Sequence, residues 1–428
     1  MFPSQKNVVL LIFLILLSSF CPRNVAAVDL DEKNDSTVSS KFDGEEIGEE
    51  EYTDSLDDLF DTAEDDVIIE DTNIDHMQQF NRHESVIIKG NFTATGGLAG
   101  GWKDYDFKTP KATVAANINA NISFDLRPDT NFRLFCRFDT EVDPQKFDEG
   151  WSGLQIDRLY VDYTIAPWMG VSVGQFPMSW GEGKLFNPAN LISGVDSSVN
   201  LKISFPLALN GINLIAYGRI RNRESLYSLE NFNFAGNFDK VFGKVKFSLG
   251  GKYNSKAGIN TYFSAKAVFQ HIEPYVDFRY DFFNVGTDEF YSSFKVLGGL
   301  IFLVDNFSMV TEYFYDGSDK NIKNDHNFGV TLAYRRIADL PLHIYINAQH
   351  TLFDNTGGAM LALTYTGFKD FDFRFGIPFL WGKENGRYTL SLNKHEMVIG
   401  DFDSNTEFYQ NWDKRISAFL TISLSKDF

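Results

Sequence analysis

From about residue 86 onward, apolar and polar residues alternate along the chain with a period of two. In 116–126 every second residue is apolar and those between are Asn, Ser or Asp, and 245–253 and 371–377 follow a similar pattern. Successive side chains of a β-strand point to opposite faces, so each of these segments has one apolar and one polar face. The pattern predicts an all-β fold whose strands separate an apolar from a polar environment.

Eighteen segments have the composition of strands, and the connections between them differ in length by parity. Even-numbered connections are short, as at 127–130, 166–168 and 304–305, whereas odd-numbered ones include 176–198 and 380–414. A soluble sandwich also alternates, but only an outer-membrane barrel has a reason to keep this parity. The predicted strands are 86–96, 113–126, 131–139, 155–165, 169–175, 199–207, 211–220, 227–238, 243–253, 260–269, 272–282, 291–303, 306–315, 327–336, 341–351, 358–366, 370–379 and 415–428. A count of sixteen stays within the error of such boundaries.

The first residues predict export. Lys6 precedes the apolar run Val8–Leu17, and small residues follow up to Ala27. This order is typical of a secretory signal peptide (1–27), and the run is shorter than the roughly 20 residues of a transmembrane helix. An uncleaved anchor and lipidation at Cys21 are the alternatives, although the bulky Phe20 before the cysteine disfavours lipidation.

Residues 28–85 form a predicted acidic extension. Within 28–75, 20 acidic residues stand against two lysines, which accounts for most of the net charge of −19. Such a segment cannot bury enough apolar surface to fold, so we expect it to be mostly disordered. A short helix is predicted at 55–67, where apolar residues recur at helical spacing. It is either a marginal helix on a tether or an element that docks on a periplasmic partner or plugs a pore.

Composition supports a barrel in a membrane. Aromatic residues make up 15% of the chain, yet the mean hydropathy is only −0.21 and no long apolar run follows residue 27. Backbone polar groups inside lipid must be paired within helices or within a closed barrel. The low hydropathy excludes helices, whereas a barrel averages its lipid-facing and lumen-facing residues to near neutrality.

Two motifs carry a family resemblance. In 416–428, Leu420, Ile422 and Leu424 alternate toward a terminal Phe428, which resembles the C-terminal signature of bacterial outer-membrane proteins, although Lys426 departs from it. The segment 174–191 (GQFPMSWGEGKLFNPANL) resembles a motif of large porin-like barrels of the alginate-export type. These resemblances imply a porin-like barrel of 86–428 in the outer membrane, whose last strand is read by the barrel-assembly machinery.

The residues offer little support for catalysis. Gly181–Lys184 resembles the end of a phosphate-binding loop, but Met178 and Leu185 replace required residues. The seven histidines form no metal-binding motif, and His343 is expected to line the lumen rather than to act in a catalytic triad. We therefore expect no enzyme activity, no cofactor and no metal, and the acidity of the chain disfavours nucleic acids as partners.

The third odd connection suggests a pore constriction. General porins fold a loop inward at this position, and here 176–198 is long and contains glycines. Arginines on the preceding strands should face the lumen, so a carboxylate-bearing loop opposite them would create a transverse field. A loop that points outward and makes only surface contacts is the alternative. The candidate constriction residues are Arg133, Arg137, Arg158, Trp180, Glu182, Lys184 and Asp196.

Together these features predict an outer-membrane channel for passive diffusion of small hydrophilic solutes. Its expected partners are outer-membrane lipids, the barrel-assembly machinery and the solutes themselves, and its termini should be periplasmic. A basic track that favours anions is a sharper alternative for the lumen. Two other classes stay open, namely an adhesive or structural surface barrel with a closed pore, and a barrel enzyme.

Overall fold

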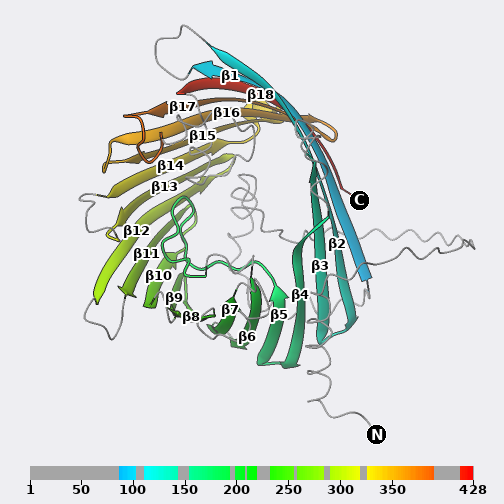
Figure 1. Ribbon diagram of the computed structural model, residues 1–428, viewed down its shortest axis with the longest axis vertical. Coiled ribbons are helices and arrows are strands. Elements are labelled where there is room, and N and C mark those ends of the chain that lie inside the picture. Colours follow the sequence, from blue (N-terminus) through cyan, green and yellow to red (C-terminus); the bar gives the residue numbers. More distant parts are fainter. Residues whose placement is uncertain are drawn as a thin grey trace, which may run out of the picture. The chain divides into compact units, whose positions relative to one another are not determined.

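Eighteen antiparallel strands form a closed barrel, seen end-on in Figure 1. The computed structural model describes residues 86–102, 110–142, 154–192, 198–207, 210–218, 232–254, 258–283, 290–318, 325–389 and 415–427. The predicted signal peptide, the acidic extension and its helix at 55–67 lie outside the described residues and stay predictions. Among the described residues, no helix is long and apolar enough to cross a membrane.

Each strand pairs with the next along the chain, and the last pairs with the first. The closing ladder runs from Asn91↔Asp427 to Trp102↔Ile416, so the described strands leave no free side of the sheet. The strands are β1 (Val86–Trp102), β2 (Lys111–Asp129), β3 (Phe132–Val142), β4 (Gln155–Ala166), β5 (Met169–Gln175), β6 (Val199–Leu207), β7 (Asn210–Gly218), β8 (Asn233–Phe242), β9 (Val245–Asn254), β10 (Gly258–Ala267), β11 (Ile272–Phe283), β12 (Tyr291–Val304), β13 (Phe307–Asp316), β14 (His326–Tyr334), β15 (Leu342–Thr351), β16 (Thr356–Phe368), β17 (Phe371–Trp381) and β18 (Ile416–Asp427).

The predicted all-β class, the count of eighteen strands and the parity of the connections are confirmed. Two boundary errors reach six residues: β1 ends at Trp102 rather than 96, and β8 begins at Asn233 rather than near 227 and ends at Phe242. The turn into β9 therefore lies at 243–244 and not at the predicted 239–242. Gly243 explains the shift, because its φ of +58° suits the tight hairpin turns that favour glycine.

Alternation divides the barrel wall into two faces. On β14 the exposed Phe328 and Tyr334 lie on one face, whereas the buried Asn327, Thr331 and Ala333 lie on the other. The same parity holds along β13, where Tyr313 is exposed and Glu312 is buried. The exposed apolar face is the outer face of the barrel, and the inner face carries most of the polar residues. This alternation is the physical basis of the sequence pattern.

Aromatic pairs occupy both ends of the outer face. Beside the short turns, Trp168 stacks on Phe205, and Phe302 contacts Phe307 edge to face. Toward the long connections, Phe294 packs against Tyr315. Aromatic rings at both rims are expected of a wall that spans a lipid bilayer.

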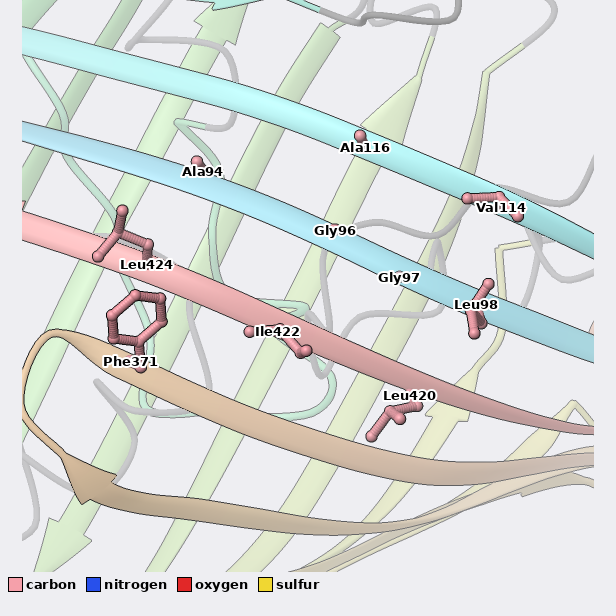
Figure 2. Close-up of a pocket in the computed structure, with 10 residues that line it drawn as sticks. All are labelled: Ala94, Gly96, Gly97, Leu98, Val114, Ala116, Phe371, Leu420, Ile422 and Leu424. Carbon is pink, nitrogen blue, oxygen red and sulfur yellow. The ribbon is translucent and has the colours of Figure 1, made fainter.

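A shallow apolar groove interrupts the outer face where the barrel closes. Figure 2 shows it over β17, β18, β1 and β2. The small residues Ala94, Gly96 and Ala116 form its floor, and bulkier side chains such as Leu420 and Ile422 border it. The groove is continuous with the apolar outer face, so acyl chains would fill it in a bilayer.

Candidate functional site

The inner wall is the candidate functional site, and the segment 176–192 dominates it. This segment begins after Gln175, the last residue of β5, and the preceding Gly174 has a φ of +130°, a conformation that side chains disfavour. The segment then runs inside the ring of strands rather than outward (Figure 1). Its contacts lie on inward side chains from β4 to β14, so it covers a large part of the inner wall.

Its two ends are held by an apolar cluster against β7, β8 and β10. Trp180 is only 5% exposed and stacks on Tyr262 of β10, with ring centroids 5.5 Å apart. Leu191 and Ile192 are fully buried in the same cluster, beside Tyr217 of β7. These inward residues of the wall are apolar or aromatic because they face protein, not water.

Two carboxylates on the wall bind the backbone of the segment's central turn. Glu312 on β13 accepts hydrogen bonds from the amides of Lys184, Leu185 and Phe186, at 2.6, 3.0 and 2.7 Å. Asp277 on β11 accepts from the amides of Glu182 and Gly183 at 3.0 and 3.1 Å.

The side chains of Asp277 and Glu312 are almost completely buried. Asp277 is 0% exposed and Glu312 is 2% exposed. A buried carboxylate is tolerated when hydrogen-bond donors surround it, and successive backbone amides provide such a concave anion-binding surface. The consecutive amides of 182–186 therefore fix the segment to the inner wall at one location.

The tip of the segment packs beside these carboxylates. Phe186 stacks on Phe314 of β13, with centroids 5.3 Å apart, and Leu185 joins the apolar cluster of Leu297 and Val310. Gly329 on β14 leaves room for this tip, since a Cβ there would lie 2.7 Å from Leu185 Cδ1. Charge complements this packing, because Glu182 Oε1 lies 3.1 Å from Lys246 Nζ of β9.

The structure separates the predicted constriction residues into two groups. Trp180, Glu182 and Lys184 lie with the inward segment against β9–β13, as described above. Trp180 is packed against the wall and is not presented to an open lumen. Asp196 lies outside the described residues.

The predicted arginines lie on the inner face of β3 and β4, and each has an acidic neighbour. Arg133 binds Asp125 through Nε and Nη2, at 3.0 and 2.9 Å. Arg137 lies 3.0 Å from Asp139. Arg158 and Arg137 approach Asp157 at 3.3 and 3.6 Å. The sequence interpretation set these arginines opposite a carboxylate-bearing loop, whereas the structure pairs each of them with an acidic residue on the wall itself.

A bulge explains why Asp157 can join this cluster. The β3–β4 ladder shifts register between Arg137 and Phe138, so Arg158 pairs with Arg137 and Ile156 pairs with Phe138. Asp157 is the extra residue, and the bulge lets it share the inner face with Arg158. Period-two counting from the sequence assigns Asp157 to the outer face, so this partner was missed.

A second inward segment, 382–389, covers part of the wall formed by β14–β16. Arg387 binds Asp325 through both terminal nitrogens, at 2.8 and 2.7 Å, and also donates to Asn327 Oδ1 at 2.7 Å. Tyr388 is fully buried and donates to Gln349 Oε1 at 3.1 Å. The sequence interpretation placed this segment in a long connection without assigning it a role.

The two groups of the second segment respond differently to burial. Burial alone lowers the pKa of Arg387, but its hydrogen bonds and charge interaction with Asp325 raise that pKa above the ordinary value. Burial raises the pKa of the Tyr388 hydroxyl. At neutral pH, Arg387 is therefore charged and Tyr388 is a neutral hydrogen-bond donor.

The wall formed by β18, β1 and β2 has a different character. Several of its inward residues are hydroxyls and amides that keep partial solvent exposure, and Asn119 is exposed, whereas Phe419 and Thr421, also inward on β18, are buried. Six of these hydroxyls and amides form what we call the hydroxyl–amide strip, consisting of Thr93, Thr95, Asn117, Asn119, Ser423 and Ser425. Most contacts that hold the two inward segments lie on β4 to β16, although Arg415, directly before β18, donates to Gly382 O at 2.8 Å.

Asp277 and Glu312 are not among the candidate residues predicted from the sequence. A signal was nevertheless present on β12, where Leu297, Ile301 and Leu303 are apolar at inward positions and their neighbours are apolar at outward positions. A strand that is apolar on both faces is buried on both faces. In a barrel, this composition indicates that protein covers the inner wall there.

Metal chemistry has no evident location in the described part of the chain. No group of three or more His, Cys, Asp or Glu residues in those ranges is arranged to hold a metal ion. His343, one of the inward residues considered from the sequence, lies near Thr366, with Nε2 and Oγ1 3.3 Å apart.

Comparison with known proteins gives distant structural neighbours. No family model and no curated protein sequence matches the chain. Among solved structures, a triple mutant of Rhodopseudomonas blastica porin is 9% identical with a TM-score of 0.42, and it aligns over 79% of this chain and 100% of its own. A structure described as showing asymmetric conductivity of engineered proteins is 10% identical, with a TM-score of 0.43 and the same coverage.

Proposed function

We propose that this protein is an outer-membrane, porin-like channel for passive diffusion of small hydrophilic solutes. One observation carries the proposal: a closed ring of strands is apolar on its outer face and retains a partly exposed hydroxyl–amide strip on its inner face. Such a wall separates lipid outside from water inside.

The aromatic pairs at both rims support insertion in a bilayer, since aromatic side chains favour the membrane interfaces. Short turns at one end and long connections at the other support an orientation in which both termini are periplasmic. We assign the long connections to the external side, and we infer that the barrel-assembly machinery inserts the chain.

The inward segment 176–192 suits the role of a constriction. It occupies space inside the ring, and the anchors at Asp277 and Glu312 hold it at one position. A channel narrowed by a fixed segment admits small solutes and excludes larger ones. In this proposal Glu182 and Lys184 border the narrowed lumen, and Arg133, Arg137 and Arg158 lie on the part of the wall formed by β3 and β4.

A planar-bilayer recording of the purified full-length mature protein tests the proposal. We expect discrete conductance steps that persist without a cofactor and scale with salt concentration. Heat-modifiable migration on gels and a β-dominated circular dichroism spectrum must accompany them, so that a misfolded sample is recognised. A correctly folded barrel that gives no conductance steps and no solute flux into liposomes would contradict the channel function. That result would favour an adhesive or structural barrel with a closed pore.

A further inference from the structure

The hydroxyl–amide strip spans the seam at which the barrel closes. Strand register places its residues in two rows across three neighbouring strands. One row is Ser425–Thr93–Asn119, and the other is Ser423–Thr95–Asn117. These residues are distant in the chain, but pairing of β18, β1 and β2 makes them one continuous inner surface. Figure 2 shows the outer face of the same three strands.

The hydrogen bonds within the strip leave donors and acceptors of its side chains available to a solute. Thr95 and Ser423 place their hydroxyl oxygens 3.0 Å apart, and those of Thr93 and Ser425 lie 3.3 Å apart. Thr93 also donates to Asn91 Oδ1 at 2.9 Å, and Ser425 accepts from Asn91 Nδ2 at 3.1 Å. A hydroxyl offers one donor and two acceptor lone pairs, so one position remains on Thr93 and Ser425 and two remain on Thr95 and Ser423. Because these side chains are partly exposed, their remaining capacity faces the lumen.

Charged side chains flank the strip on both sides. On β17, Asp372 is paired in register with Ser423, and on β3 Arg137 and Asp139 lie beyond β2. The neutral surface is therefore about three strands wide, roughly 10 Å between the outer strand axes. This width suits one sugar ring, with a charged border on either side.

We propose that the strip is the route for neutral polyhydroxylated solutes, such as simple sugars, through this channel. The inference rests on the proposed channel function and narrows its substrate class. Hydroxyl and amide groups can exchange donors and acceptors with successive hydroxyls of a sugar as it moves, replacing the water that it loses. Each exchange is nearly balanced in energy, which keeps binding weak enough for transit.

An ionic solute of the same size gains less from this surface. It carries a tightly held hydration shell, and the strip has no charge to compensate for losing that shell. The charged walls on either side contain both signs, as in the Arg133–Asp125 pair, so they attract neither sign strongly over a distance. The strip therefore favours solutes that carry hydroxyl groups and no net charge over ionic solutes of the same size.

The test compares glucose with gluconate and protonated glucosamine, which share a carbon skeleton but differ in charge. Their entry into liposomes is followed by swelling, with the full-length mature protein and with a variant carrying Thr93→Val, Thr95→Val and Asn119→Leu. Valine keeps the shape and strand preference of threonine while removing its hydroxyl. Thr311→Val, on the outer face of β13, is the matched control. Potassium chloride conductance and heat-modifiable migration verify that each variant forms an intact channel.

We expect glucose to enter fastest in the unaltered channel. In the triple variant the rate of glucose entry should fall roughly two- to tenfold, which corresponds to the net free energy of one neutral hydrogen bond. The potassium chloride conductance should change little. The control should match the unaltered protein. Equal glucose rates in the variant and the control, with conductance intact, would overturn the strip as a route and leave the channel standing. If the unaltered, folded protein neither conducts nor admits any solute, the channel function fails and the inference fails with it.

Discussion

Two parts of one inner wall differ sharply in this barrel. From β7 to β16 the inward side chains are largely buried beneath the segments 176–192 and 382–389, as at Asp277, Glu312 and Gln349. On β18, β1 and β2 the hydroxyl–amide strip stays partly exposed. Both parts have the same strand period and the same register rules. The difference shows that alternation determines which way a side chain points, and the chemistry of the inward residues then determines whether protein or water meets it.

The residues beneath the first segment make the distinction concrete. Leu297, Ile301 and Val310 are inward, apolar and buried, so exposing them to water would be unfavourable. Thr93 and Asn119 are inward and polar, so covering them would require partners for every donor and acceptor. The covered wall therefore favours docking of a segment, and the strip favours hydration.

The largest effect should come from removing the covering segment. Replacing 180–190 by a short Gly-Ser linker removes the anchored turn and widens the lumen. We expect single-channel conductance to rise severalfold, because a channel's resistance is concentrated at its narrowest section. The same linker inserted in place of 103–109, between β1 and β2, is the control and should leave conductance nearly unchanged. Unaltered conductance after removal of 180–190 would show that this segment does not limit the pore.

The next effect concerns the carboxylate that binds the turn. Glu312→Gln replaces one acceptor oxygen with an amide donor directed at backbone amides, which should destabilise docking by about 2–4 kcal/mol. We expect faster hydrogen exchange at the amides of 184–186 and noisier open-channel current. Glu273→Gln is a matched control, because Glu273 is equally buried but pairs with Lys266 instead of the segment. Equal exchange in both variants would contradict the anchoring role of Glu312.

A smaller effect should follow from filling the space under the tip. Gly329→Phe places a ring where Leu185 packs, so the tip must shift away from β14. Gly298→Phe adds the same ring on β12, where an added Cβ meets nothing within 4 Å. We expect protease cleavage within 176–192 to increase only in the first variant. Comparable cleavage in both would mean that the tip does not depend on this contact.

The second inward segment should loosen at alkaline pH. Tyr388 has a raised pKa in the folded protein because it is buried, so its neutral form stabilises docking fully below the ordinary tyrosine pKa of about 10. That stabilisation is lost as pH rises from there toward the higher pKa of the folded state. A spin label at the exposed Lys383 should gain motional freedom above pH ~10, and Tyr388→Phe should weaken this dependence. An identical pH profile in both proteins would exclude Tyr388 as its source.

The smallest effect should come from the arginines. Reversing Arg133 and Arg137 to glutamate adds negative charge to a wall that already contains Asp125, Asp139 and Asp157. We expect the reversal potential in a salt gradient to move modestly toward cation selectivity, because the added charge attracts cations. Replacement by Lys at both positions keeps the charge and serves as the control. A shift toward anions would contradict the assignment of these side chains to the lumen.

The fold was largely predictable because a barrel repeats one local rule. The alternation of apolar and polar residues located all eighteen strands. The lengths of the segments between them predicted short even-numbered connections and the long odd-numbered ones. The end of β8 was misplaced because Asp239, a residue type common in turns, follows the predicted strand, whereas it lies inside β8. Local composition cannot distinguish an inward polar residue from a turn residue when a strand is short.

The site was less predictable because its contacts are distant in sequence. The inward course of 176–192 depends on Asp277 and Glu312, which lie 94 or more residues away from the amides that they bind. Arg387 likewise depends on Asp325, three strands earlier in the barrel. Each of these polar residues is equally compatible with a solvated wall when only its neighbours in sequence are considered. Only the folded barrel identifies their partners.

The closing ladder between β1 and β18 has a consequence for the order of assembly. Asn91 and Asp427 are 336 residues apart. Their strands therefore pair at the largest entropic cost of loop closure in the barrel. The hydroxyl–amide strip straddles that seam and comes into being only when the last strand docks on the first. A barrel in which β18 has not yet paired with β1 therefore lacks the complete strip. Barrel closure and formation of the proposed solute route occur in the same step.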